Sequence, residues 1–258
     1  MNINENDLLG YLAAFMWPFF RLSSMFIAMP VLSVKAAPNK TRVMLSALIT
    51  FLILPVLPAM PAVPLFSFEG WMVTIQQIGI GITAGFILQM VFSIVLFAGQ
   101  AIAYSMGLGF ASMVDPASGV QVPVVAQLFV ISGSLLFLAL NGHLLVIEMI
   151  VQSFSSLPVG LLGLEQANLW QVVMWSSQIF ADGVLLSLPI LATLLFVNIS
   201  FGVASKAAPQ LQVFGVGFPI TILLGMVLIW VGISTMIENF TDMLHAGFAF
   251  ISQILRLS

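Results

Sequence analysis

Between residues 70 and 147 the chain carries a single formal charge, that of Asp115. The stretches on either side of it, 71–103 and 124–147, contain no Asp, Glu, Lys or Arg. A helix of about 20 apolar residues crosses a hydrocarbon core of about 30 Å. Because lipid offers no hydrogen-bond partners, the backbone of such a run must satisfy its own amide groups, as a helix does. The two stretches therefore predict membrane-spanning helices.

The composition of the whole chain supports the same class. Of its 258 residues, 61% are hydrophobic and 6% are charged, whereas a soluble domain carries about 25% charged residues. We therefore expect one all-α membrane unit without a soluble domain. The chain has no Cys, which excludes disulfides, thiolate metal sites and cysteine nucleophiles. A net charge of −3, without a basic cluster of the kind that binds nucleic acid or anionic lipid, argues against nucleic-acid binding.

Apolar runs of helical length follow one another along the chain. They lie at about 8–34, 43–60, 71–103, 124–151, 169–204 and 211–236, with a weaker run at 240–257. The third and fifth would be roughly 50 Å long as straight helices, too long for a simple crossing. They must tilt, kink at a residue such as Pro189, or continue beyond the bilayer inside a protein assembly. Gly79, Gly81 and Gly85 predict the close approach of another helix.

The loop at 104–123 joins the two uncharged runs, and its glycines and prolines argue against a continuous helix. Irregular backbone between two membrane helices is tolerated only where it is buried in protein or lines a cavity. The loop is too apolar for a solvated linker, and Asp115 with Pro116 is a turn signal. The pattern favours a pore-lining or gating loop over a plain connection. Its candidate residues are Met106, Gly107, Leu108, Gly109, Phe110, Met113, Val114, Asp115, Pro116 and Gly119.

Four ionisable side chains lie within apolar runs: Arg21, His143, Glu148 and Asp182. Each costs about 2.5–3.5 kcal/mol on insertion scales and is a candidate functional group. For Arg21 and Asp182 we expect structural contacts between helices, with a transport role as the alternative. Arg21 would pair with a carboxylate or cap backbone carbonyls. His143 and Glu148 are separated by about 140° around a helix and cannot form a dyad within it.

Other chemical patterns are weak. Glu238, Asp242 and His245 share one face of a C-terminal helix, which could hold a metal but is more typical of the polar stripe of an interface helix. The sequence GIGITA at 79–84 fits a dinucleotide-binding pattern, yet no strand precedes it, so helix packing is the better interpretation. No G-x-S-x-G elbow or Ser-x-x-Lys pair occurs. We therefore expect neither catalysis nor a cofactor.

Several short motifs occur in a fixed order. They are Arg21 followed by Pro30, the basic loop from Lys35 to Arg42, MGLGFASMVDPASG at 106–119 with Pro123, LLFLALNGHLLVI at 135–147, SLP at 156–158, and AAPQLQVFGVGFP at 207–219. Taken together they resemble the FliR family of flagellar type III export-gate proteins, called SctT in injectisomes. The resemblance covers essentially the whole chain.

The resemblance implies a fold of long kinked helical hairpins, in which a FliP-like half (about 1–165) joins a FliQ-like half (about 166–258). It also implies assembly with several copies of FliP and FliQ into an export channel of the bacterial inner membrane, within the flagellar basal body. FlhB would wrap the channel's cytoplasmic mouth, and FlhA is a further expected partner. The family's plug loop maps onto about 106–122. Lys206 and Gln210 belong to the FliQ-like half and are expected to make polar contacts between helices or subunits.

On this basis we expect a non-enzymatic gate subunit through which unfolded flagellar proteins pass. The apolar loop would seal the resting pore by packing and dewetting. The rival interpretation is a secondary transporter for a small solute. A transporter would require internal repeats with paired broken helices and a polar site near the midplane, and no convincing repeat is present.

Overall fold

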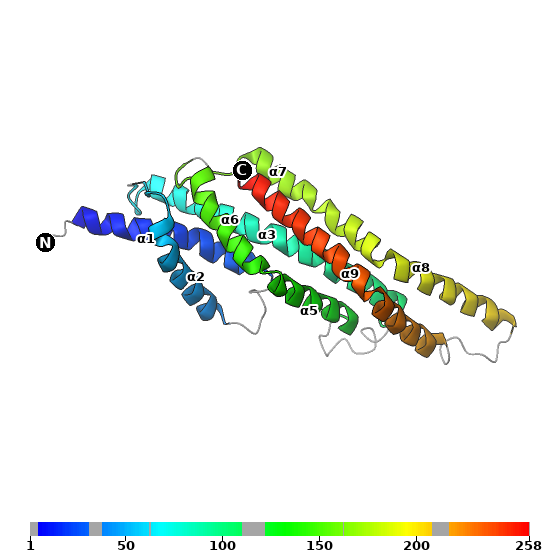
Figure 1. Cartoon of the computed structure of the whole chain (residues 1–258). Coiled ribbons are helices and arrows are strands. Elements are labelled where there is room, and N and C mark those ends of the chain that lie inside the picture. Colours follow the sequence, from blue (N-terminus) through cyan, green and yellow to red (C-terminus); the bar gives the residue numbers. More distant parts are fainter. Residues whose placement is uncertain are drawn as a thin grey trace. The chain divides into compact units, whose positions relative to one another are not determined.

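The computed structural model describes residues 5–30, 38–61, 63–109, 122–161, 163–207 and 217–257. Within these residues the regular structure is entirely helical (Figure 1). The elements are α1 (Glu5–Ala28), α2 (Asn39–Ile53), a short 3₁₀ turn at Leu54–Val56, α3 (Phe68–Ser105), α5 (Val124–Ala139), α6 (Gly142–Ser156), α7 (Gln166–Trp175), α8 (Ser177–Ala207) and α9 (Phe218–Ile254). The all-α class expected from the sequence is confirmed.

Three stretches of the described chain are long and apolar enough to cross a membrane. They are α3, the stretch Gln166–Lys206 that contains α7 and α8, and α9. A fourth candidate is the pair α5 and α6, which is bent by 62°. With 38 and 37 residues, α3 and α9 are each about 56 Å long, against a hydrocarbon core of about 30 Å. The excess length expected for 71–103 is confirmed, and α9 shares it.

The apolar run at 124–151 is divided by an Asn-Gly turn. Asn141 adopts a left-handed conformation with φ of 55°, which Asn tolerates better than most residues. Gly142 is buried, and a Cβ at this position would lie 2.5 Å from the ring of Phe137. This close approach explains why a residue without a side chain follows Asn141, and the chain changes direction there between α5 and α6.

A single helix joins the apolar run expected at 211–236 to the weaker run at 240–257, from Phe218 onward. α9 continues without a break from Phe218 to Ile254. Glu238 and Asp242 lower the apolarity of the sequence, but both are exposed. The buried side chains Phe240 and Leu244 continue the packed face on the other side of the helix. The apolar run and the weaker run after it belong to one helix, because polar residues on one face do not interrupt a helix that is packed through the other.

The chain divides into two compact units. Unit 1 comprises Met1–Met90, Phe137–Trp175 and Leu244–Ser258, and unit 2 comprises Val91–Leu136 and Ser176–Met243. Each unit therefore combines segments from both of the halves expected at 1–165 and 166–258. The likeness of those halves to FliP and FliQ stays a prediction.

In unit 1, α1 packs against the first part of α3 at two glycines. A Cβ at Gly81 would overlap the carbonyl oxygen of Arg21, and one at Gly85 would lie 2.6 Å from the Cβ of Ala28. The predicted close approach of another helix is confirmed at these two positions. It was wrong for Gly79, whose Cβ would meet no atom within 4 Å.

Unit 2 is held together by the later part of α3, α5, α8 and the first part of α9. Phe92 of α3 meets Phe240 of α9 edge-on at a centroid distance of 5.6 Å. Phe97 meets Phe180 of α8 in the same manner and at the same distance. Gly99 allows α5 to approach, because a Cβ there would lie 2.7 Å from the Cα of Ala126. α8 continues as one helix through Pro189.

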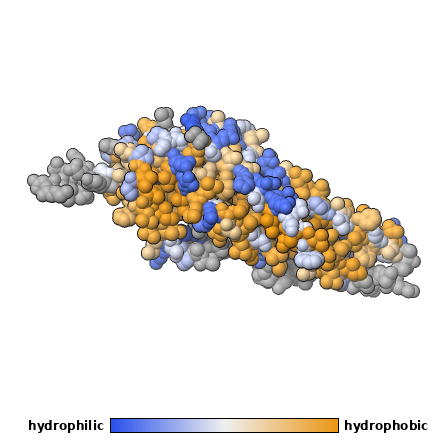
Figure 2. All heavy atoms as spheres, viewed as in Figure 1, coloured by the Kyte–Doolittle hydropathy of each residue, from blue (hydrophilic) through white to orange (hydrophobic). Residues whose placement is uncertain are grey.

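Apolar side chains also cover much of the surface in the view of Figure 2. In the most apolar 18-residue stretch of Gln166–Lys206, only 22% is buried. In the corresponding stretch of α9, only 11% is buried. Phe196 and Trp230, for example, are 73% and 75% exposed. An apolar surface of this extent requires lipid or other protein chains to cover it.

Candidate functional site

The start of the predicted gating loop is a regular helix end in unit 2. Gly107 has φ of +86°, its N–H donates to the carbonyl of Tyr104 at 3.0 Å, and the N–H of Leu108 donates to the carbonyl of Ala103 at 3.0 Å. These two bonds are the Schellman pattern, with glycine in the left-handed position that favours it. Gly107 therefore ends α3 and turns the chain into the loop.

Met106 and Gly107, which form this turn, both pack against α9. Met106 is 1% exposed, and a Cβ at Gly225 would lie 2.6 Å from its Cγ. The hydroxyl of Thr221 donates to the carbonyl of Met106 at 3.3 Å. At Gly107 a Cβ would overlap the ring of Phe218. The helix end that begins the loop is thus anchored to the first turns of α9.

A weaker contact joins the same helix end to α8. The side-chain amide of Asn198 donates to the carbonyl of Ser105 at 3.4 Å. Leu108 and Gly109 are partly exposed. The other predicted loop residues, namely Phe110, Met113, Val114, Asp115, Pro116 and Gly119, lie outside the described residues. Of the predicted set, the structure therefore places Met106 as a buried anchor and Gly107 as the turn.

Arg21 lies in the interior of unit 1 with no exposed surface. Its Nε donates to Oε1 of Gln77 at 2.8 Å, its Nη1 to Oγ of Ser153 at 2.8 Å, and its Nη2 to the carbonyl of Leu157 at 2.9 Å. Its guanidinium carbon lies 4.0 Å from the ring centre of Phe154, a cation–π geometry. Arg21 therefore links α1, α3, α6 and the residue that follows α6.

The sequence left two alternatives for Arg21, namely pairing with a carboxylate and capping of backbone carbonyls. It contacts a backbone carbonyl, but no carboxylate of the described residues lies within ion-pair distance of it. Sequence reasoning missed Gln77 and Ser153. Their polar side chains in apolar runs were the available signal, because a buried polar group requires a partner.

The remaining ionisable candidates do not gather into one site. Glu148 is exposed on α6 and accepts a hydrogen bond from the amide of Gln152 at 3.1 Å. His143 is partly buried, and its Nδ1 has no hydrogen-bond partner among the described residues. Asp182 is partly exposed on α8, in unit 2. Lys206 is exposed in the last turn of α8, and Gln210 lies outside the described residues.

The polar stripe of α9 also lacks the geometry of a metal site. Glu238, Asp242 and His245 are all exposed. Across the described ranges, no three side chains of the metal-binding types come together. The interface interpretation of this stripe stays a prediction.

The loop between α6 and α7 is attached to α3 and to the residues that follow α9. The amide of Gln76 donates to the carbonyl of Leu161 at 2.5 Å. Glu165 pairs with Arg256 at 2.5 Å, although both side chains are largely exposed, at 67% and 49%. Arg256 has φ of 55° and ends the last helix in the position usually taken by glycine.

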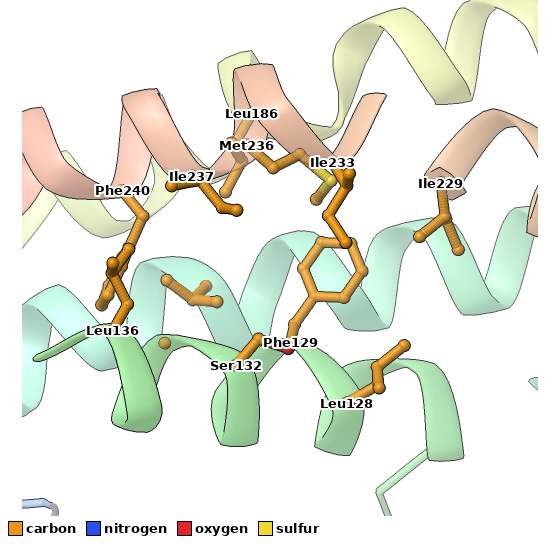
Figure 3. A pocket seen from close by; sticks show the side chains of 12 residues that line it. Leu128, Phe129, Ser132, Leu136, Leu186, Ile229, Ile233, Met236, Ile237 and Phe240 are labelled. Atoms are coloured by element: carbon orange, nitrogen blue, oxygen red, sulfur yellow. The ribbon is translucent and has the colours of Figure 1, made fainter. Parts of the chain in front are cut away.

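Unit 2 contains a cavity of about 70 Å³ between α5 and α9 (Figure 3). Phe129 and Leu136 line it from α5, and Ile233 and Phe240 line it from α9. The hydroxyl of Ser132 is the sole polar side-chain group among its lining residues. A cavity of this composition cannot orient a charged or polar solute.

Comparison with known proteins agrees with the motifs. Residues 12–247 match the family described as bacterial export proteins, family 1. The chain is 38% identical over 226 residues to the flagellar biosynthetic protein FliR of Escherichia coli strain K12, covering 88% of this chain and 86% of that protein. It is 25% identical over 235 residues to the FliR of Bacillus subtilis strain 168, covering 89% of each. The chain therefore belongs to the FliR family of membrane proteins of the flagellar export apparatus.

Proposed function

We propose that this chain is a structural and gating subunit of the flagellar protein export channel, and that residues 106–122 form a plug that helps to seal the resting pore. The observation that carries the proposal is the anchored helix end at Met106–Gly109. A plug must be fixed at its base and able to turn at its hinge. Met106 supplies the fixed base through α9, and Gly107 supplies the turn.

The exposed apolar surface supports assembly with other membrane chains. Exposed large apolar side chains continue from Leu169 in α7 to Val203 in α8, a distance of about 51 Å along a helix. A hydrocarbon core of about 30 Å cannot cover this length unless the helix is strongly tilted. We propose that copies of FliP and FliQ cover part of it, in the bacterial inner membrane, and that FlhB and FlhA contact the assembled gate.

The transporter alternative finds no support in the described residues. Arg21 uses its three hydrogen bonds to hold helices together. The cavity of unit 2 offers one hydroxyl and no charge. A solute site near the membrane midplane would need several convergent polar groups.

The test is the ion conductance of the assembled complex in lipid bilayers. Deletion of residues 110–117 should leave the complex assembled and raise its resting conductance, because the apolar seal is lost. A second variant, Met113→Ser with Val114→Ser, should leak in the same direction.

The matched control is Val124→Ser with Ile131→Ser, which exchanges two exposed apolar side chains of α5 and should stay closed. If both loop variants assemble and remain as tight as the parent, the plug proposal is wrong.

A further inference from the structure

Two fully buried side chains of unit 1 each carry an N–H group that has no acceptor among the residues that the structure describes. They are Nε1 of Trp17 and Nε2 of Gln77, and both residues are 0% exposed. The orientation of the Gln77 amide is fixed by Arg21, which can only donate and therefore selects the oxygen. Its NH₂ group must consequently point away from the guanidinium contact. Buried donors without partners are rare and require an explanation.

The packing of α1 on α3 places these two donors at the same level. Gly81 of α3 meets Arg21 and Ser24 of α1, and Gly85, one turn later, meets Met25 and Ala28. The two helices therefore run in parallel at this contact. One turn earlier, Gln77 comes level with Trp17, which precedes Arg21 by one turn on the same face of α1. Gln77 and Trp17 thus lie at neighbouring levels of the two helices, one turn before Gly81 and Arg21, and Gln77 contacts the guanidinium directly.

The charge at this place is also unbalanced. The described partners of Arg21 are an amide oxygen, a hydroxyl and a carbonyl, all of them neutral. The hydroxyl of Ser153 itself donates a hydrogen bond to the carbonyl of Ile150 at 2.6 Å. The site therefore combines one buried positive charge with surplus donors. Burying a charge is costly unless it is paired.

We propose that unit 1 binds one small anion of the size of chloride between the indole N–H of Trp17 and the amide N–H of Gln77, beside Arg21. An anion accepts hydrogen bonds from both donors and balances the charge of the guanidinium. A water molecule could satisfy both donors, but it would leave the charge of the guanidinium unbalanced.

The first test uses the full chain purified with its co-expressed partners. Its thermal unfolding midpoint is measured in sodium chloride and in sodium gluconate at equal sodium concentration, because gluconate is a much larger anion than chloride. A bound anion stabilises the folded state in proportion to the logarithm of its concentration above the dissociation constant. The midpoint should therefore be higher in chloride and rise with its concentration. Equal midpoints in the two salts would overturn the proposal.

Two variants locate the effect. Trp17→Phe removes one donor, and Gln77→Glu keeps the oxygen that Arg21 needs while it replaces the second donor by a negative charge. Both should lose the dependence on chloride. In gluconate, Gln77→Glu should melt at or above the parent, because its carboxylate then balances Arg21.

The matched controls are Trp71→Phe and Gln171→Glu, at exposed positions of α3 and α7. Both should keep the chloride dependence of the parent. A chloride effect that survives in Gln77→Glu would refute the assignment, and this outcome is readable even if Trp17→Phe fails to fold. The inference is independent of the plug proposal, because all its residues belong to unit 1 and the measurement involves no export.

Discussion

Gly79 and Gly81 provide a matched pair for testing the contact between α1 and α3. Both lie inside α3, two residues apart, so replacing either by Ala gives the same gain of about 1 kcal/mol in helix propensity. A Cβ at position 79 would meet no atom within 4 Å, whereas one at position 81 would overlap the carbonyl oxygen of Arg21 and the hydroxyl of Ser24. The comparison therefore isolates the steric term.

The size of that term follows from the nature of the atoms involved. A backbone carbonyl cannot rotate away as the end of a flexible side chain can, so α1 itself must move. Overpacking of this kind costs about 1–3 kcal/mol. We expect Gly79→Ala to be neutral or stabilising, and Gly81→Ala to be less stable than it by about 1–3 kcal/mol. The midpoints should then differ by about 2–12 °C.

The assay is thermal unfolding of the full chain with its partners, followed by the amount of folded complex that remains. Ser24→Ala combined with Gly81→Ala should rescue only part of the loss, because the carbonyl of Arg21 still obstructs the Cβ. Equal stability of Gly79→Ala and Gly81→Ala would show that the two helices are not in contact at this register.

Three further changes test other parts of the structure by the same unfolding measurement. Arg21→Met should destabilise unit 1 by at least about 3 kcal/mol, because it leaves three buried acceptors without a donor; a loss below about 1 kcal/mol would refute the central place of Arg21. Gly107→Ala should cost about 1–2 kcal/mol from its left-handed φ, and more from the overlap with Phe218; an unchanged midpoint would contradict this helix end. Arg256→Gly should be neutral within about 1 kcal/mol, because relief of its positive φ offsets loss of the exposed pair with Glu165; a large loss would show that the pair is stronger than its exposure allows.

The membrane class and the long helices could be predicted from the sequence, because both follow from the absence of charge. The division of the apolar run 124–151 at Asn141 was harder to predict. Leu140 and Leu144 keep the apolar pattern unbroken on both sides, and the Asn-Gly pair was the sole local turn signal. In α9, Glu238 and Asp242 weaken the apolar pattern without interrupting the helix.

The partners of Arg21 could not be predicted from local patterns. Gln77 and Ser153 are 56 and 132 residues away in the sequence, and tertiary packing alone brings them together. The role of Gly107 could be predicted, for the opposite reason. A glycine directly after an apolar helical run is typical of a helix end, and its left-handed φ is a local property of the chain.

The most direct test of the gating account is disulfide crosslinking to an export substrate halted in the channel. The chain has no Cys, so Val114→Cys gives it a single thiol in the proposed plug. The halted substrate carries single cysteines along the segment that occupies the channel. The account predicts an adduct with Val114→Cys and none with Leu135→Cys, a position on α5 that is 63% exposed. Halted export without an adduct at Val114→Cys, or an equal adduct at Leu135→Cys, would contradict it.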